Sequence, residues 1–113
     1  MVLRIVRFLV SERSEAAFMQ HMRDLAQRSI GSVEGLVELR LVRTVERGRV
    51  VPLGMSLWRD WESLQGFYGE QIEAPLLVDP YGEWTESATV EHFEYVFTLQ
   101  AEGSGGGAPM LFA

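Results

Sequence analysis

The chain contains no cysteine, no lysine and no asparagine among its 113 residues. Without cysteine there is no thiol nucleophile, no thiolate metal site and no disulfide, and without lysine there is no Schiff-base chemistry. The two histidines, His21 and His92, are too few for a tetrahedral metal site unless glutamates complete it. We therefore expect no metal and no cofactor, although haem ligation by a lone histidine stays open.

Long apolar stretches and clustered positive charge are scarce as well. No window approaches about 18 apolar residues without a charge, which argues against a transmembrane helix. Arg4 and Arg7 interrupt the first apolar run too early for a signal peptide. We expect a cytoplasmic protein without a membrane partner. The net charge of −6 and the lack of a basic patch argue against a nucleic-acid partner.

The composition that remains, 47% hydrophobic, is typical of a soluble globular protein. The length suits one domain with its own core but leaves little room for a spacious cavity. After the expected domain at 1–100, the Gly-rich tail at 101–113 is typical of a flexible linker that ends in a short apolar segment. We expect Met110, Leu111 and Phe112 to dock into a groove of the same chain or of a partner.

The apolar patterns predict strands at 2–10, 36–45, 50–58 and 89–99. One helix is expected from Ser11 or Ser14 to Gly31 and a second after Asp60, with a hairpin turn at 46–49. This order is the split βαβ, or ferredoxin-like, plan of the α+β class: a four-stranded antiparallel sheet with two helices on one face. The other face would be bare and apolar, so we expect a second copy to cover it.

Titratable residues interrupt the last predicted strand, where His92 and Glu94 alternate with an aromatic face. The polar side chains of the same strand parity are Glu38, Arg40, Ser56, Trp58, His92 and Glu94. If the strands share one sheet with regular alternation, all six point to the face opposite the helices.

These residues suggest either catalysis or a structural role. His92 is the candidate general base, with Glu94 or Glu38 tuning it and Arg40 binding an anionic or enolate oxygen. Alternatively, Glu38 pairs with Arg40 at an edge or dimer seam, and His92 satisfies a buried hydrogen bond. Aromatic residues near the second helix could wall a pocket for a flat ligand or merely cap the helix layer. The candidate substrate-binding residues are Glu38, Ser56, Trp58, Trp61, Phe67 and Trp84.

Two short motifs support a family resemblance. Gly35 precedes an alternating strand, and the run from Trp58 to Leu64, with Arg59, Asp60 and Ser63, leads from the third strand into the second helix. On these residues and the element order over about 2–99, the chain resembles the dimeric α+β barrel proteins of the antibiotic-biosynthesis monooxygenase type. The resemblance implies a homodimer or higher homo-oligomer in which two sheets face each other, with a small-molecule pocket in each subunit.

The resemblance transfers no catalytic residue. Phe67 stands where many members have histidine, Ser56 stands where many have glutamate, and the chain lacks the asparagine used by members that oxygenate aromatic polyketides or degrade haem. Fold alone does not determine function.

The predicted function is that of a small-molecule-binding barrel. Its enzymatic form is a cofactor-independent monooxygenase for an aromatic or polyketide-like substrate, in which His92 removes a proton, Arg40 stabilises the anion and the carbanion reacts directly with O₂. The alternative is a non-catalytic ligand-binding or stress-response barrel whose polar face is a dimer seam. An isomerase or lactone-type activity is a third interpretation.

Overall fold

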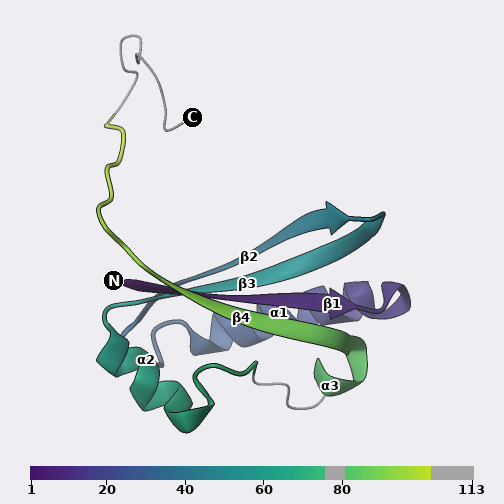
Figure 1. The fold of residues 1–113 in the computed structure, drawn as a ribbon, viewed down its shortest axis with the longest axis horizontal. Coiled ribbons are helices and arrows are strands. Elements are labelled where there is room, and N and C mark those ends of the chain that lie inside the picture. Colours follow the sequence, from purple (N-terminus) through teal and green to yellow (C-terminus); the bar gives the residue numbers. More distant parts are fainter. Residues whose placement is uncertain (76–80, 103–113) are drawn as a thin grey trace.

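A computed structural model of the chain describes residues 1–75 and 81–102 (Figure 1). Its strands pair antiparallel in one four-stranded sheet of order β2-β3-β1-β4, and α1 and α2 lie on the same side of it (Figure 1). The predicted ferredoxin-like α+β plan is confirmed. The elements are β1 (Val2–Val10), η1 (Glu12–Ser14), α1 (Glu15–Ser29), β2 (Leu36–Glu46), β3 (Arg49–Trp58), α2 (Trp61–Tyr68), η2 (Gly69–Gln71), α3 (Tyr81–Trp84) and β4 (Thr85–Glu94).

Local sequence signals fix the element boundaries near α2 and the hairpin. The Asp60 carboxylate accepts a hydrogen bond from the Ser63 N–H at 2.8 Å, which caps α2 as expected. This bond lowers the pKa of Asp60. The β2–β3 hairpin turns at Arg47 and Gly48, whose φ values of 51° and 77° suit a two-residue hairpin loop.

The interior between sheet and helices contains two separate apolar clusters. The first joins the C-terminal half of β1 to α1 and α3 through Phe8, Val10, Phe18 and Tyr81. The second lies under α2 and consists of Val2, Trp58 and Leu64. Arg4 shares a face of β1 with Val2 and Phe8, and it is only 1% exposed. A buried cation therefore lies between the two clusters along β1.

The last strand differs from its expected range at both ends. It begins early, because α3 delivers Thr85 directly into pairing with Val10. It ends at Glu94, because its partner strand β1 starts at Val2. Tyr95 still donates its N–H to the Met1 carbonyl at 2.9 Å, and after it Val96 and Leu99 are 92% and 87% exposed.

None of the helices in the described residues combines the length and apolarity needed to cross a membrane. The cytoplasmic location stays a prediction. The predicted docking of Met110, Leu111 and Phe112 falls on residues outside the described part of the chain.

Gly35 and Ser63, both part of the family resemblance, lie against each other. Gly35 has φ +80°, and a Cβ added there would lie 2.2 Å from Cβ and Oγ of Ser63. The backbone N–H of Arg59 also donates to the Gly35 carbonyl at 2.8 Å. A side chain at residue 35 would therefore push the start of β2 away from α2.

We expect Gly35→Ala to destabilise the fold more than Gly48→Ala, which changes a hairpin glycine of similar φ (+77°) with open space around it. Left-handed strain costs about 1–2 kcal/mol in both variants, and overpacking adds about 1–3 kcal/mol at residue 35 alone. Urea unfolding measures both losses. Adding Ser63→Gly to Gly35→Ala should recover the difference, and equal losses for the two alanine variants would contradict this packing.

Candidate functional site

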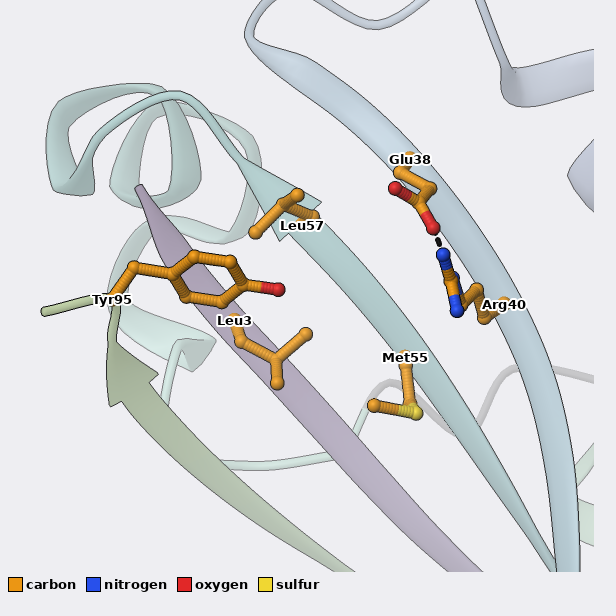
Figure 2. Close-up of a pocket in the computed structure, with 6 residues that line it drawn as sticks. All are labelled: Leu3, Glu38, Arg40, Met55, Leu57 and Tyr95. Carbon is orange, nitrogen blue, oxygen red and sulfur yellow. Dashed lines mark hydrogen bonds and ion pairs between the residues drawn. The ribbon is translucent and has the colours of Figure 1, made fainter. Parts of the chain in front are cut away.

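The six polar residues expected on one face are divided between the two faces of the sheet. Arg4 pairs with Ser56 and His92, and Val2 pairs with Trp58 and Glu94, so these four polar residues share the helix-covered face of β1. Only Glu38 and Arg40 lie on the open face, the side without helices (Figure 2). The prediction that all six point away from the helices is wrong for Ser56, Trp58, His92 and Glu94.

A β-bulge at the start of β2 causes the division. Leu36 pairs with Trp58, but Glu38 pairs with Leu57, where regular pairing would bring it opposite Ser56. The extra residue turns the following side chains to the other face. Glu38 and Arg40 are therefore separated from His92 by the thickness of the sheet.

Glu38 and Arg40, the pair on the open face, have the geometry expected for a structural ion pair. Arg40 forms an ion pair with Glu38, and this contact raises the pKa of Arg40. Both side chains are well exposed, at 69% and 41%. They border a hollow of about 170 Å³ with Leu3, Met55, Leu57 and Tyr95 (Figure 2). Ligand sites are usually larger than about 300 Å³, so this hollow is smaller than a typical ligand site.

Arg4 is the centre of a polar cluster beneath α2. Its Nη1 donates to the Ile72 carbonyl and lies 3.0 Å from Nε2 of His92, while its Nη2 donates to the Ala74 carbonyl at 3.0 Å. The guanidinium carbon lies 3.8 Å from the centre of the Tyr68 ring. Residues from β1, β4, α2 and the segment after η2 thus meet at one buried cation.

The contact with Arg4 fixes the protonation state of His92. A guanidinium can only donate hydrogen bonds, so Nε2 of His92 accepts and the ring carries its proton on Nδ1. Burial lowers the pKa of His92 below its usual 6.5, and the positive charge of Arg4 lowers it further. His92 is therefore a neutral imidazole at pH 7, the form that accepts a proton.

Trp61 and Glu94 complete the cluster. The Trp61 indole Nε1 donates to Oε1 of Glu94 at 2.7 Å, which ties the first turn of α2 to the end of β4. The Trp61 ring lies 5.4 Å from the His92 ring, centre to centre. Three residues predicted from the sequence, His92, Glu94 and Trp61, therefore lie together. Burial raises the pKa of the neighbouring Tyr68 hydroxyl.

The other predicted ligand-binding residues lie elsewhere. Trp58 is 2% exposed and donates to Ser56 Oγ at 2.9 Å, so both residues belong to the packed interior next to the cluster. Phe67 packs on Trp58 and is half exposed at the outer side of α2. Trp84 packs on Phe18 at the far end of β4, eight residues from His92 and on the order of 25 Å away along the strand.

Sequence reasoning missed Arg4, the residue that connects the cluster. The available signal was its parity, since Arg4 shares the apolar face of β1 with Val2, Phe8 and Val10. Charged residues are rarely buried unless they are paired. An arginine on the core face of a central strand therefore marks a position where a partner is needed.

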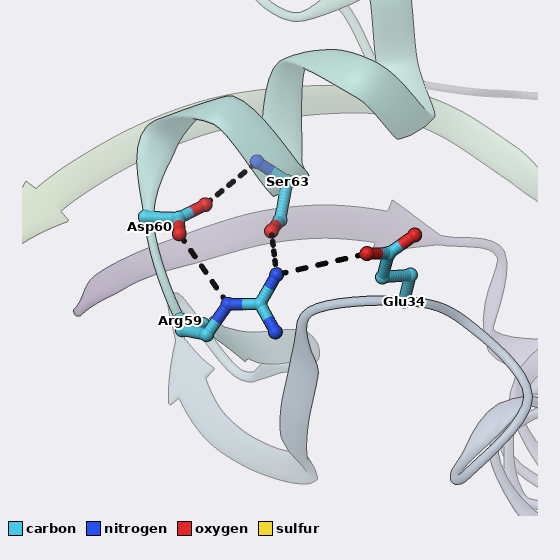
Figure 3. Close-up of polar contacts among 4 residues, drawn as sticks. All are labelled: Glu34, Arg59, Asp60 and Ser63. Carbon is cyan, nitrogen blue, oxygen red and sulfur yellow. Dashed lines mark hydrogen bonds and ion pairs between the residues drawn. The ribbon is translucent and has the colours of Figure 1, made fainter.

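A larger hollow, about 490 Å³, lies at the start of α2 between Glu34 and Phe67. Its cation, Arg59, contacts Asp60 at 3.3 Å, Ser63 at 3.2 Å and Glu34 at 3.9 Å (Figure 3). These exposed side chains already form hydrogen bonds and ion pairs with one another. The hollow is therefore a weaker candidate for a catalytic site than the Arg4 cluster. Within residues 1–75 and 81–102, no group of three or more histidine or carboxylate side chains is arranged to bind a metal.

No family model and no curated protein matches the chain, but solved structures do. The haem degrader MhuD from Mycobacterium tuberculosis superposes with a TM-score of 0.68 at 17% identity, covering 88% of this chain and 100% of that one. A candidate antibiotic biosynthesis monooxygenase from Deinococcus radiodurans gives 0.69 at 13% identity, covering 91% and 100%. A Nitrosomonas europaea protein of unknown function gives 0.67 at 16% identity, covering 90% and 95%.

The chain shares the ferredoxin-like α+β fold of these solved structures. The resemblance seen in the sequence is thereby confirmed at the level of fold. In this fold, Gly35, Asp60 and Ser63 lie at the junction between β2 and α2. The sequence motif therefore marks the fold and not the chemistry.

Proposed function

We propose that the chain is a small-molecule-binding α+β barrel that deprotonates an aromatic or polyketide-like substrate as a cofactor-independent monooxygenase. The observation that supports this most is the neutral His92 imidazole 3.0 Å from the Arg4 guanidinium beneath α2. The imidazole can take a proton from carbon, and the cation can stabilise the oxyanion that forms. Arg4 thus takes the role predicted from the sequence for Arg40, the stabilisation of the substrate anion.

The reaction balances with O₂ as the second substrate. The acidic C–H of a substrate methylene replaces the Arg4 N–H at Nε2 of His92, and the imidazole takes the proton. The charge moves to a conjugated substrate oxygen, to which Arg4 donates. The carbanion gives its electrons to O₂ and forms a C–O bond, and the protonated hydroperoxide then loses water. The methylene becomes a carbonyl, and O₂ supplies one oxygen to that carbonyl and one to water.

Trp61 and Glu94 have supporting roles in this proposal. The indole ring beside His92 offers a flat surface for an aromatic substrate. Glu94 accepts the indole N–H and so fixes the ring. The Glu94 carboxylate therefore positions Trp61, and it transfers no proton in the proposed reaction.

Haem does not fit His92 as the structure presents it. The Nε2 lone pair that would ligate iron accepts a hydrogen bond from Arg4, and a guanidinium at 3.0 Å repels a second cation there. Although MhuD binds haem, we assign no haem chemistry to this chain.

A homodimer is the second part of the proposal. The open face carries large apolar side chains that remain exposed, among them Phe93 at 45%. Phe93 pairs with Leu3, which borders the small hollow of Figure 2. A second copy would cover this face and enlarge that hollow.

We expect the wild type to have about twice the 12.8 kDa mass of one chain in size-exclusion chromatography with light scattering. Phe93→Glu should give a monomer, because it places a charge on the face that the second copy would cover. Ala17→Glu adds the same charge at an exposed position of α1 and should leave the dimer intact. A monomeric wild type, or a dimeric Phe93→Glu, argues against this interface.

A non-catalytic ligand-binding barrel is the second candidate function. The observation in its favour is that Arg4 is 1% exposed and bonded to two carbonyls, so its cluster is closed in the free protein. Such a site can bind without turnover.

Oxygen uptake separates the two functions. Wild-type protein incubated with anthrone-type and hydroquinone-type probes should consume one O₂ per probe oxidised, at a rate above that of buffer alone. Probe conversion without O₂ uptake would indicate an isomerase. Binding without conversion across the panel would reject the monooxygenase and leave the ligand-binding barrel.

A further inference from the structure

We propose that Arg4 is the receptor for an anionic oxygen of the ligand, a carboxylate or phenolate. In the free protein the carbonyls of Ile72 and Ala74 occupy the place of that anion. The inference rests on the proposed function, which places the ligand site beneath α2. It specifies in addition that the ligand is negatively charged.

The charge around Arg4 supports an anionic ligand. Among the residues that the structure describes, no carboxylate forms an ion pair with this guanidinium, and Glu73 influences it only at longer range. Its contacts are neutral groups: two carbonyls, one imidazole and one phenol ring. Its Nε is buried without a hydrogen-bond partner in the same set. A cation that is 1% exposed normally has an anionic partner, and the described residues supply none within ion-pair distance of Arg4.

The hydrogen-bond geometry of Arg4 also suits a carboxylate. Arg4 donates from Nη1 to one carbonyl and from Nη2 to another, two residues further along the same segment. Two oxygens that accept from the two terminal nitrogens reproduce the way a guanidinium binds a carboxylate. A carboxylate can therefore replace both carbonyls, gaining a charge-assisted pair where the free protein has two neutral acceptors.

The segment that carries the two carbonyls is bonded to the sheet through Arg4. Ile72 and Ala74 follow η2, and Arg4 ties their carbonyls to β1, at the centre of the sheet. Ala74 also donates its own N–H locally, to the Gln71 carbonyl at 3.0 Å. An anion that takes over Arg4 removes these two hydrogen bonds to the sheet, while Ile72 keeps its apolar packing against the cluster of Val2, Trp58 and Leu64. Ligand binding therefore loosens the backbone of this segment at Arg4.

Two flat probes of the same shape test the charge preference. Naphthalene-2-carboxylate and naphthalene-2-carboxamide are titrated into wild-type protein and followed by calorimetry. We expect the carboxylate to bind at least about tenfold more tightly, because only it supplies the charge-assisted pair. Arg4→Gln should abolish this preference, and Arg43→Gln, a matched change at an exposed position of β2, should keep it. Equal affinities in wild type, or a preference that survives Arg4→Gln, would overturn the proposal.

A second measurement remains decisive if Arg4→Gln does not fold. Amide hydrogen exchange at residues 72–74 of wild-type protein should become faster with the carboxylate than with the carboxamide. Unchanged exchange overturns the carbonyl replacement. Neither probe has an acidic methylene, so the outcome does not depend on turnover. A selective anion site without oxygen uptake would retain this inference and reject the monooxygenase, and oxygen uptake without anion selectivity would do the reverse.

Discussion

His92→Gln is expected to lower kcat/KM for oxygen uptake by about 10²–10⁴-fold, the contribution typical of a positioned general base. Glutamine can accept the Arg4 hydrogen bond that His92 accepts at 3.0 Å, so the cluster keeps its packing. Its amide cannot take a proton near neutral pH. The measurement is the initial rate in an oxygen electrode with the best probe of the panel.

His21→Gln is the matched control for this variant. His21 is the other histidine of the chain and lies against Tyr81 and Trp84 in the distant aromatic cluster. The control should retain the wild-type rate. If His92→Gln also stays within about threefold of wild type, the assignment of the base is wrong.

The pH profile gives a second readout for His92. Its lowered pKa means that the neutral base is already formed below pH 6.5, so kcat/KM should fall only as the pH drops through that lowered value. The unfolded chain binds this proton more readily than the folded one, so His92 stabilises the fold less as the pH falls below about 6.5. A rate that rises mainly above pH 7.5 would assign the reaction to another group.

Phe18→Ala is expected to reduce the free energy of unfolding by about 3–5 kcal/mol, a large part of the 5–15 kcal/mol of a typical domain. Phe18 is completely buried, and its ring centre lies 4.9 Å from that of Phe8 and 5.5 Å from that of Tyr81. Phe18 lies on α1 and packs against β1 and α3. Removing its ring therefore leaves a cavity where these three elements meet. Urea unfolding followed by circular dichroism measures the loss.

Phe67→Ala serves as the comparison for this core substitution. Phe67 is 51% exposed, although its ring packs on Trp58 and Tyr68. Because half of the side chain is already in water, we expect a loss of about 1 kcal/mol or less. Similar losses for the two variants would mean that the apolar cluster around Phe18 contributes less than its burial indicates.

The element order was predictable because its signals are local. Asp60 caps α2 through a residue three positions away, and the hairpin depends on Arg47 and Gly48 alone. The end of β4 was less predictable. Tyr95 continues the alternating pattern beyond the end of the strand. The length of β4 depends on where its partner β1 begins, and the sequence of β4 alone does not show this.

The candidate site was only partly predictable for a related reason. The structure brings the predicted residues His92, Glu94 and Trp61 together, but strand parity alone does not say which face of the sheet the helices cover. The bulge before Glu38 then turned Arg40 to the opposite face. The distance between Arg4 and His92 arises from the β1–β4 register, a contact across 88 positions that no single-strand pattern reveals.

The most direct test of the account is where a flat anionic ligand binds. In ¹H–¹⁵N spectra of wild-type protein titrated with naphthalene-2-carboxylate, the Trp61 indole signal and the amides of Ile72 and Ala74 should shift. The amides of Glu38 and Arg40 on the open face should not. Shifts confined to Glu38, Arg40 and Leu57, with Trp61 unchanged, would place the site on the open face of the sheet and contradict the assignment to Arg4 and His92.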